Sequence, residues 1–121
     1  MMTMIRCTEP LDAAQMLVTN WLEIRGFALI APQSIGAFNT VLLRAESAST
    51  KVLAALCVAR FPDRAETLSA MAFERFANLA DDEHRDLLEL RVQVDYFGHA
   101  SAPVQCVRHA RRDVGVAQAA A

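Results

Sequence analysis

The sequence has few of the residues that build common catalytic motifs. Its four glycines stand singly, so there is no glycine-rich loop that would hold a phosphate. No GxSxG elbow, CxxC pair or HExxH helix motif is present. These absences argue against phosphate-loop enzymes, elbow-type hydrolases and common zinc sites. We therefore predict a protein without enzymatic activity that uses no cofactor and no metal.

Long apolar runs and a strong net charge are also missing. The longest apolar run is far below the ~18 residues of a transmembrane helix, and the opening MMTMIRCTEP does not resemble a signal peptide. A net charge of −2 gives no electrostatic reason to expect a nucleic-acid or membrane partner. Three widely spaced cysteines, Cys7, Cys57 and Cys106, are typical of a reducing compartment. We expect a cytoplasmic protein.

The most informative segment that is present is Val52–Ala59 (VLAALCVA), which is apolar on both faces of any strand that it could form, because a free cysteine behaves as a small hydrophobic residue. A strand with one solvated face alternates in polarity, whereas a strand covered on both faces reads as a continuous apolar run. In a chain of 121 residues, which fits a single domain, helices would cover one face and another molecule is a candidate for the other. This segment leads us to predict a homodimer.

Two stretches have helical periodicity. The first begins with Thr8 as the N-cap and Pro10 in the first turn, and Gly26 ends it in a left-handed conformation. Its predicted buried stripe is Leu11, Ala14, Leu17, Val18 and Trp21, and Met16 lies outside the stripe. In the second, Asp63 and Glu66 resemble a capping box. Its predicted stripe is Ala65, Leu68, Ala72, Phe76 and Leu79, with Met71 and Phe73 on its edges.

Five strand-like segments complete the chain. They are Phe27–Ala31 (ended by Pro32), Thr40–Ala45, Val52–Phe61, the alternating Leu88–Phe97 and Val104–Val107. Short connections between the first three favour an antiparallel meander. We predict one α+β domain over residues 1–121 with an antiparallel sheet of four to five strands, in the order αβββαββ. Residues from about 113 onward lack patterning and should be peripheral.

Histidine and cysteine provide no convincing catalytic or metal site. Cys106 and His109 are the only close pair, and a spacing of three places them on opposite faces of a strand. The expected roles are a buried cysteine and a surface histidine. His84 lies in a charged connector, and His99 lies in a loop with no adjacent acid to orient it.

Two groups of residues are candidates for partner contacts. Apolar side chains at positions that the fold cannot cover indicate an interface, and we assign this role to Met16, Met71 and Phe73. The basic cluster near the C-terminus, with Arg108, Arg111 and Arg112, is a candidate contact for a polyanion or an acidic partner. A solvated charge run is the alternative.

The order of elements from Leu11 to Phe97, with three strands leading into Phe61-Pro62-Asp63 and a second helix, resembles the small class I chaperones of type III secretion. That resemblance implies a homodimer that presents apolar patches to an extended segment of another protein. The chain departs from this family because it has no convincing helix after Val107.

The same order also resembles the restriction-endonuclease-like fold. The chemistry of that fold requires an Asp on the second strand and an acid-x-Lys motif on the third strand, whose carboxylates together bind magnesium. Here the second strand begins with Asn39-Thr40 and the third ends with Cys57-Val58-Ala59-Arg60, so these acids are missing. The resemblance implies an inhibitor or regulator, encoded by a mobile element, that binds host machinery. We expect a protein-binding module, in the first version a chaperone and in the second an inhibitor.

Overall fold

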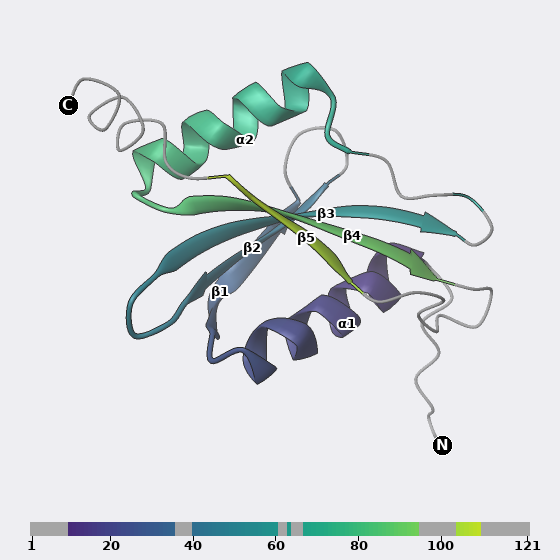
Figure 1. Cartoon of the computed structure of the whole chain (residues 1–121), viewed down its shortest axis with the longest axis horizontal. Coiled ribbons are helices and arrows are strands. Elements are labelled where there is room, and N and C mark those ends of the chain that lie inside the picture. Colours follow the sequence, from purple (N-terminus) through teal and green to yellow (C-terminus); the bar gives the residue numbers. More distant parts are fainter. Residues whose placement is uncertain (1–9, 36–39, 61–62, 64–66, 95–103, 110–121) are drawn as a thin grey trace.

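One five-stranded sheet lies between two helices (Figure 1). The computed structural model describes residues 10–35, 40–60, 63, 67–94 and 104–109. The elements are α1 (Pro10–Ile24), β1 (Ala28–Ile35), β2 (Val41–Glu46), β3 (Lys51–Arg60), α2 (Ala70–Asp82), β4 (Asp86–Val94) and β5 (Gln105–His109). The predicted α+β class and the order αβββαββ are confirmed. The predicted peripheral tail lies outside the described residues.

The strands follow one another across the sheet in chain order, β1-β2-β3-β4-β5. The predicted antiparallel meander of β1, β2 and β3 is confirmed, and β5 is antiparallel to β4. β3 and β4 pair in parallel, which makes the sheet mixed. The reason is the connection between them, since a parallel neighbour requires a long crossover and α2 provides it.

The two helices cover opposite faces of the sheet, as Figure 1 shows. On the α1 side, Leu43, Ala54, Leu56 and Leu90 pack beneath the helix. On the α2 side, Leu42, Leu53, Ala55 and Leu87 pack against Phe76 and the buried alanines of α2. Val52–Ala59 thus receives its cover on both faces from the same chain. The strand therefore gives no reason of its own to expect a second molecule.

α1 buries the stripe that its periodicity predicts, with one addition. Ala14 and Val18 are fully buried and Leu17 and Trp21 pack partly against the core, but Leu22, absent from the predicted stripe, is also fully buried. Gly26 has a φ of +89°, which is the left-handed end predicted for this helix. Thr8 and the side chain of Leu11 lie outside the described residues.

β1 continues past the residue that was expected to end it. The strand runs to Ile35, and its pairing with β2 shifts between Ile30 and Ser34. Pro32 lies within this irregular stretch. An edge strand tolerates proline because one side of its backbone needs no ladder partner, whereas a central strand would lose a hydrogen bond.

The predicted start of the second helix is wrong by several residues. α2 begins at Ala70, and the hydroxyl of Ser69 accepts a hydrogen bond from the backbone N–H of Ala72. Leu68 and Asp63 therefore precede the helix, so Asp63 is not its N-cap, and Ala65 and Glu66 lie outside the described residues. Serine and aspartate are both favoured at the N-cap position, and in this structure the N-cap of α2 is Ser69. Ala72, Phe76, Ala77 and Ala80 form the buried face.

Candidate functional site

Glu89 on β4 is a buried carboxylate, with 3% of its surface exposed. The alternation of β4 predicts Leu88, Leu90 and Val92 on a buried face, and this is confirmed. The same alternation predicts Glu89 on the solvated face, and this is wrong. The face that carries Glu89 is the one that α2 covers, so both sides of β4 are buried near its middle.

Three groups donate hydrogen bonds to this carboxylate. Nε2 of His109 lies 2.7 Å from Oε1, the backbone N–H of Leu68 lies 3.3 Å from Oε2, and Nη2 of Arg91 lies 3.2 Å from Oε2. An ionised carboxylate only accepts, so Nε2 of His109 carries the proton of this bond. Burial raises the pKa of Glu89, but the bonds from His109, Leu68 and Arg91 outweigh it and leave the pKa below its usual value.

Two further side chains complete what we call the Glu89 cluster, which consists of Cys57, Phe73, Glu89, Arg91 and His109. The ring of Phe73 meets the imidazole of His109 edge-on, with centroids 4.8 Å apart. Cys57 is the direct neighbour of Arg91 in the parallel ladder. Burial raises the pKa of Cys57 to about 11, with a further rise from Glu89 and an opposing effect of Arg91.

The geometry of the cluster connects elements of the fold. Glu89 links β4 to β5 through His109 and to the segment before α2 through Leu68. With its pKa near 11, Cys57 is a protonated thiol at neutral pH and is therefore not an activated nucleophile. Sequence reasoning missed the cluster, because its members come from β3, α2, β4 and β5. The only signal in the sequence that could have indicated the cluster is the position of Glu89 between Leu88 and Leu90.

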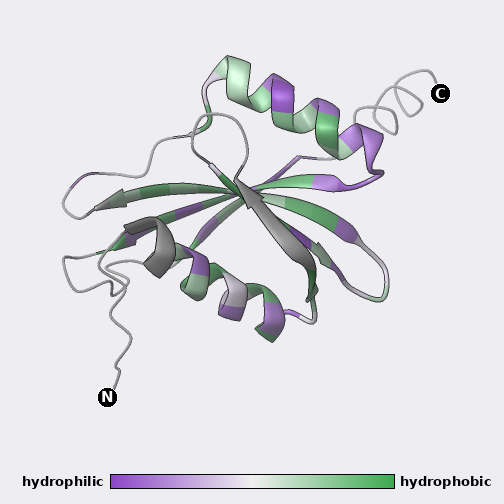
Figure 2. Cartoon of the chain, turned by 180° about the vertical axis from the view of Figure 1, so that it is seen from behind, coloured by the Kyte–Doolittle hydropathy of each residue, from purple (hydrophilic) through white to green (hydrophobic). Residues whose placement is uncertain are grey.

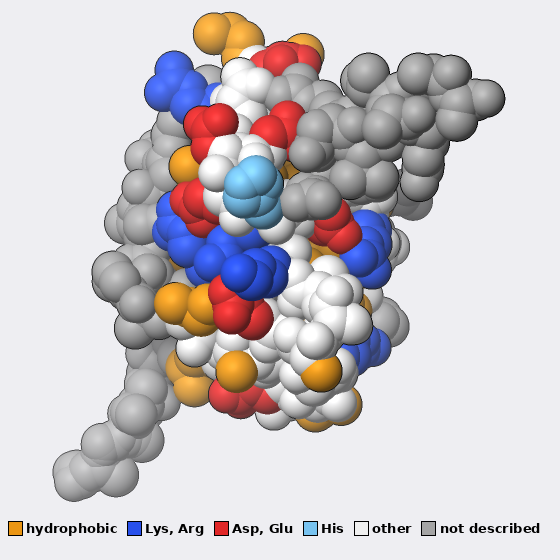
Figure 3. Space-filling model, turned by 90° about the vertical axis from the view of Figure 1, so that its left-hand side faces the viewer, with side chains coloured by type: hydrophobic (Ala, Val, Ile, Leu, Met, Phe, Trp, Pro, Cys, Tyr) orange, Lys and Arg blue, Asp and Glu red, His pale blue; other side chains and the backbone are white. Residues whose placement is uncertain are grey.

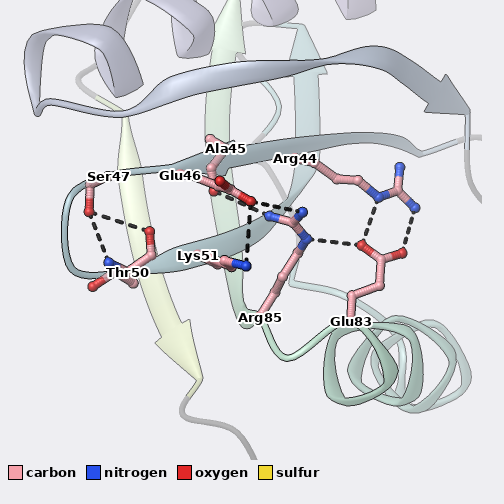
Figure 4. A network of polar contacts seen from close by, with 8 residues as sticks. All are labelled: Arg44, Ala45, Glu46, Ser47, Thr50, Lys51, Glu83 and Arg85. Carbon is pink, nitrogen blue, oxygen red and sulfur yellow. Dashed lines mark hydrogen bonds and ion pairs between the residues drawn. The ribbon is translucent and has the colours of Figure 1, made fainter.

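A second polar network joins the C-terminal end of α2 to the β2–β3 hairpin (Figure 4). Glu83 receives two hydrogen bonds from Arg44, at 2.8 and 2.9 Å, and a third from Arg85 at 3.0 Å. Arg85 continues to Glu46 at 3.4 Å, and Lys51 lies 3.9 Å from the same carboxylate. The hydrogen bond from Arg44 lowers the pKa of Glu83, and burial opposes this only in part. Figure 3 shows positive and negative side chains side by side at this end of the molecule, so neither charge dominates there.

The large apolar side chains that remain exposed lie on the outer faces of the helices. Within the described segments these are Met16 at 58%, Ile24 at 72% and Met71 at 72%. A shallow depression of about 420 Å³ opens beside Met16 on α1, and one of similar size lies beside Met71 on α2. Figure 2 shows both helices alternating between apolar and polar residues, as expected for helices with one face on a sheet.

The residues predicted to bind a partner occupy different environments. Met16 and Met71 are exposed, whereas Phe73 is partly buried and packs against the α2-side core. Arg108 is exposed and pairs with Asp86 at 2.5 Å. Arg111 and Arg112 lie outside the described residues, as does His99. His84 is exposed at the end of α2, in a left-handed conformation with φ 58°.

The structure separates Cys106 from His109 in the manner that strand geometry predicts. His109 faces α2 and bonds to Glu89, and Cys106 is exposed. The expectation of a buried cysteine is therefore wrong, and His109 is partly buried, with 29% of its side chain exposed. Among the described residues, no three histidine, cysteine or acidic side chains come close enough together to hold a metal ion.

Comparison with protein-family models and with curated protein sequences gives no relative. No protein-family model matches the chain, and no curated protein sequence matches it. None of the described helices combines the length and the apolar character that crossing a bilayer requires. We therefore infer function from the surfaces and side-chain clusters described above.

Proposed function

We propose that the protein is a non-enzymatic module that binds another protein through the outer faces of its helices. The observation that carries the proposal is the contrast between the covered central strands, β2, β3 and β4, and the exposed Met16, Ile24 and Met71. Methionine adapts its shape to irregular partners and is common at protein-binding surfaces. Arg91 and His109 both bond to Glu89, which supports a structural role for these three side chains, although the buried Nε of Arg91 has no partner among the described residues.

Two concrete versions of this function differ in how the sheet is used. A chaperone of the type III secretion kind implies a homodimer with apolar patches for an extended segment. An inhibitor or regulator with a nuclease-like fold implies a closed domain that binds host machinery. Helices on both faces of β3 favour the second version, because the central strand is already covered within one chain.

Affinity capture tests the proposal. Wild-type protein and a Met71→Gln variant are immobilised, and proteins retained from a lysate of the source organism are quantified by mass spectrometry. Asp82→Asn is the matched control, because Asp82 is an exposed residue of the same helix. We expect a protein retained by wild type and by Asp82→Asn, and depleted by Met71→Gln or by Met16→Gln. Equal retention by all four proteins would overturn the proposal.

A nuclease assay tests the opposing view that the protein is an enzyme. Purified protein is incubated with supercoiled DNA and magnesium, and strand breaks are followed on a gel. We expect no cleavage above that of a buffer control. Magnesium-dependent nicking that co-purifies with the protein, and that changes in a Glu89→Gln variant, would contradict a purely binding function.

A further inference from the structure

α2 is held against the sheet by smaller apolar side chains than α1. Its buried face consists of one phenylalanine and three alanines, Phe76, Ala72, Ala77 and Ala80. α1 buries larger side chains, among them Val18 and Leu22. The free energy of burial scales with the apolar area removed from water, and alanine has the least to remove. Contacts at the two ends of α2 therefore provide a larger share of its attachment to the sheet.

The C-terminal end of α2 is closed by its own backbone. His84 adopts a left-handed conformation with φ 58°, and its N–H donates to the carbonyl of Asp81 at 3.1 Å. The N–H of Arg85 donates to the carbonyl of Ala80 at 2.8 Å, which completes a Schellman motif. Only residues 83–85 then separate α2 from β4. The direction of this end of the helix is therefore fixed relative to the sheet.

Side chains fix the same end of α2 to β2 (Figure 4). Arg44 of β2 donates two hydrogen bonds to Glu83, at 2.8 and 2.9 Å, and Arg85 donates a third at 3.0 Å. Arg85 also donates to the backbone carbonyl of Ala45 at 3.5 Å. Hydrogen bonds between ionised groups are stronger than those between neutral groups, and a bidentate pair also fixes orientation. We call these bonds the C-terminal contacts.

Longer and weaker contacts hold the N-terminal end of α2 in the part of the chain that the structure describes. The backbone N–H of Leu68 donates to Glu89 at 3.3 Å, and the ring of Phe73 meets the imidazole of His109 with centroids 4.8 Å apart. His109 in turn bonds to the same carboxylate at 2.7 Å. An aromatic edge contact is weaker than a bidentate ion pair. We call these the N-terminal contacts, and their partner outside β4 and α2 is β5.

The connections on the two sides of α2 differ in reach. Residues 83–85 join α2 to β4, and residues 61–69 join β3 to α2. Gln93 donates to the backbone carbonyl of Asp63 and so ties the second connection to β4 before the helix begins. The chain between Asp63 and α2 still spans about 20 Å when extended, against about 10 Å for the first connection. The N-terminal end of α2 therefore has the greater freedom to leave the sheet.

We propose that α2 is a lid that opens from its N-terminal end, pivots on the C-terminal contacts and is latched by His109 of β5. Opening uncovers the sheet residues beneath the helix, which are Leu42, Leu53, Ala55 and Leu87. A helix of 13 residues is marginally stable by itself, so the part that leaves the sheet also frays. Displacement of β5 removes the latch and thereby releases α2. No partner is needed for this motion, which goes beyond the proposed function.

Thiol labelling at the two ends of α2 tests the lid. Ala72 and Ala80 lie on its buried face, with 3% and 2% exposed, so Ala72→Cys and Ala80→Cys place matched thiols beneath opposite ends. We call them the N-terminal and the C-terminal thiol. Labelling by iodoacetamide in native buffer is read by peptide mass spectrometry, which separates the new thiols from the native cysteines. After subtraction of the global unfolding measured in urea, the N-terminal thiol should label about tenfold faster.

Two adjacent residues of β5 separate the latch from the general stability of the strand. His109→Ala removes the contact with Phe73 and the bond to Glu89. It should speed labelling of the N-terminal thiol about tenfold and leave the C-terminal thiol unchanged. Arg108→Ala is the matched control, because Arg108 pairs with Asp86 on the opposite face of the strand. It should change neither rate.

Hydrogen exchange of the unsubstituted protein measures the same motion without a new cysteine. The amides of residues 74–76 should exchange before those of residues 80–82, since the first group leaves the sheet when the lid opens. Any of three results would overturn the lid. They are a C-terminal half of α2 that labels or exchanges as fast as the N-terminal half, a His109→Ala variant that leaves the N-terminal thiol unchanged, and an Arg108→Ala variant that speeds it as much as His109→Ala does.

Discussion

His109 and Glu89 join the edge strand β5 to β4 by a hydrogen bond of 2.7 Å between Nε2 and Oε1. β5 has only five residues and a sheet neighbour on one side, so it has few ladder bonds of its own. The buried carboxylate of Glu89 also accepts hydrogen bonds from the backbone N–H of Leu68 and from the guanidinium of Arg91. Glu89 thereby connects the edge strand β5 to the segment that precedes α2. We infer that Glu89 couples the stability of β5 to that of the segment that precedes α2.

Replacing Glu89 tests that coupling. Glu89→Gln keeps the size of the side chain but removes the charge that strengthens three hydrogen bonds. We expect a loss of about 1–3 kcal/mol in the free energy of unfolding, measured by urea denaturation. Asp82→Asn, at an exposed position, should change it by no more than about 0.5 kcal/mol. Equal stability of Glu89→Gln and wild type would show that the cluster contributes nothing.

The lowered pKa of Glu89 predicts acid sensitivity. A carboxyl group whose pKa is lower in the folded state binds protons more readily when unfolded. Its contribution is present above the pKa of the unfolded state and is lost as the pH falls through the folded pKa. Wild type should therefore lose stability below about pH 4.5 more steeply than Glu89→Gln. Urea midpoints measured at several pH values check this, and parallel curves would contradict it.

Phe73 and Met71 should respond differently to truncation. Phe73 packs against the core and against His109, so Phe73→Ala should cost about 2–3 kcal/mol. Met71 is exposed on the same helix, and Met71→Ala should stay within about 0.5 kcal/mol of wild type. Thermal melts compare the two variants. If both melt near the wild-type temperature, Phe73 has no share in the core and its predicted role in partner binding gains support.

Trp21 should contribute to stability through its packing and through Arg25. It packs partly against the α1-side core, so Trp21→Ala should cost about 3 kcal/mol. Arg25→Ala removes the cation above the ring and should cost about 0.5–1 kcal/mol. It should also change the fluorescence of the single tryptophan. A folded Trp21→Ala variant that has lost only partner binding would assign this residue to function.

The cysteines should differ in their reactivity. The rise in the pKa of Cys57 from 9.0 to about 11 lowers its thiolate fraction about 100-fold at pH 8. Partial desolvation also raises the pKa of Cys106, but this side chain is exposed. Iodoacetamide should therefore label Cys106 well before Cys57, as read by peptide mass spectrometry. In urea the two rates should converge, and equal rates in the native protein would contradict the burial of Cys57.

The sequence by itself determined the local elements. The spacing of Ala14 and Val18 predicts the buried stripe of α1, and both residues are buried. The alternation of Leu88, Leu90 and Val92 predicts strand β4 and the face that these residues bury, and all three are buried. The run Val52–Ala59 required cover on both faces, and the structure has it. These features depend on neighbours within a few residues along the chain, so periodicity alone reveals them.

Only the tertiary structure decided how the elements combine. The crossover through α2 made β4 parallel to β3 and covered the face on which Glu89 lies, so a position predicted to be solvated is buried. Its partners His109 and Leu68 lie about 20 residues away on either side, and Cys57 comes from a third strand. Burial and hydrogen bonding of a polar residue depend on such distant neighbours, because they are properties of the packed assembly and are not encoded in local periodicity.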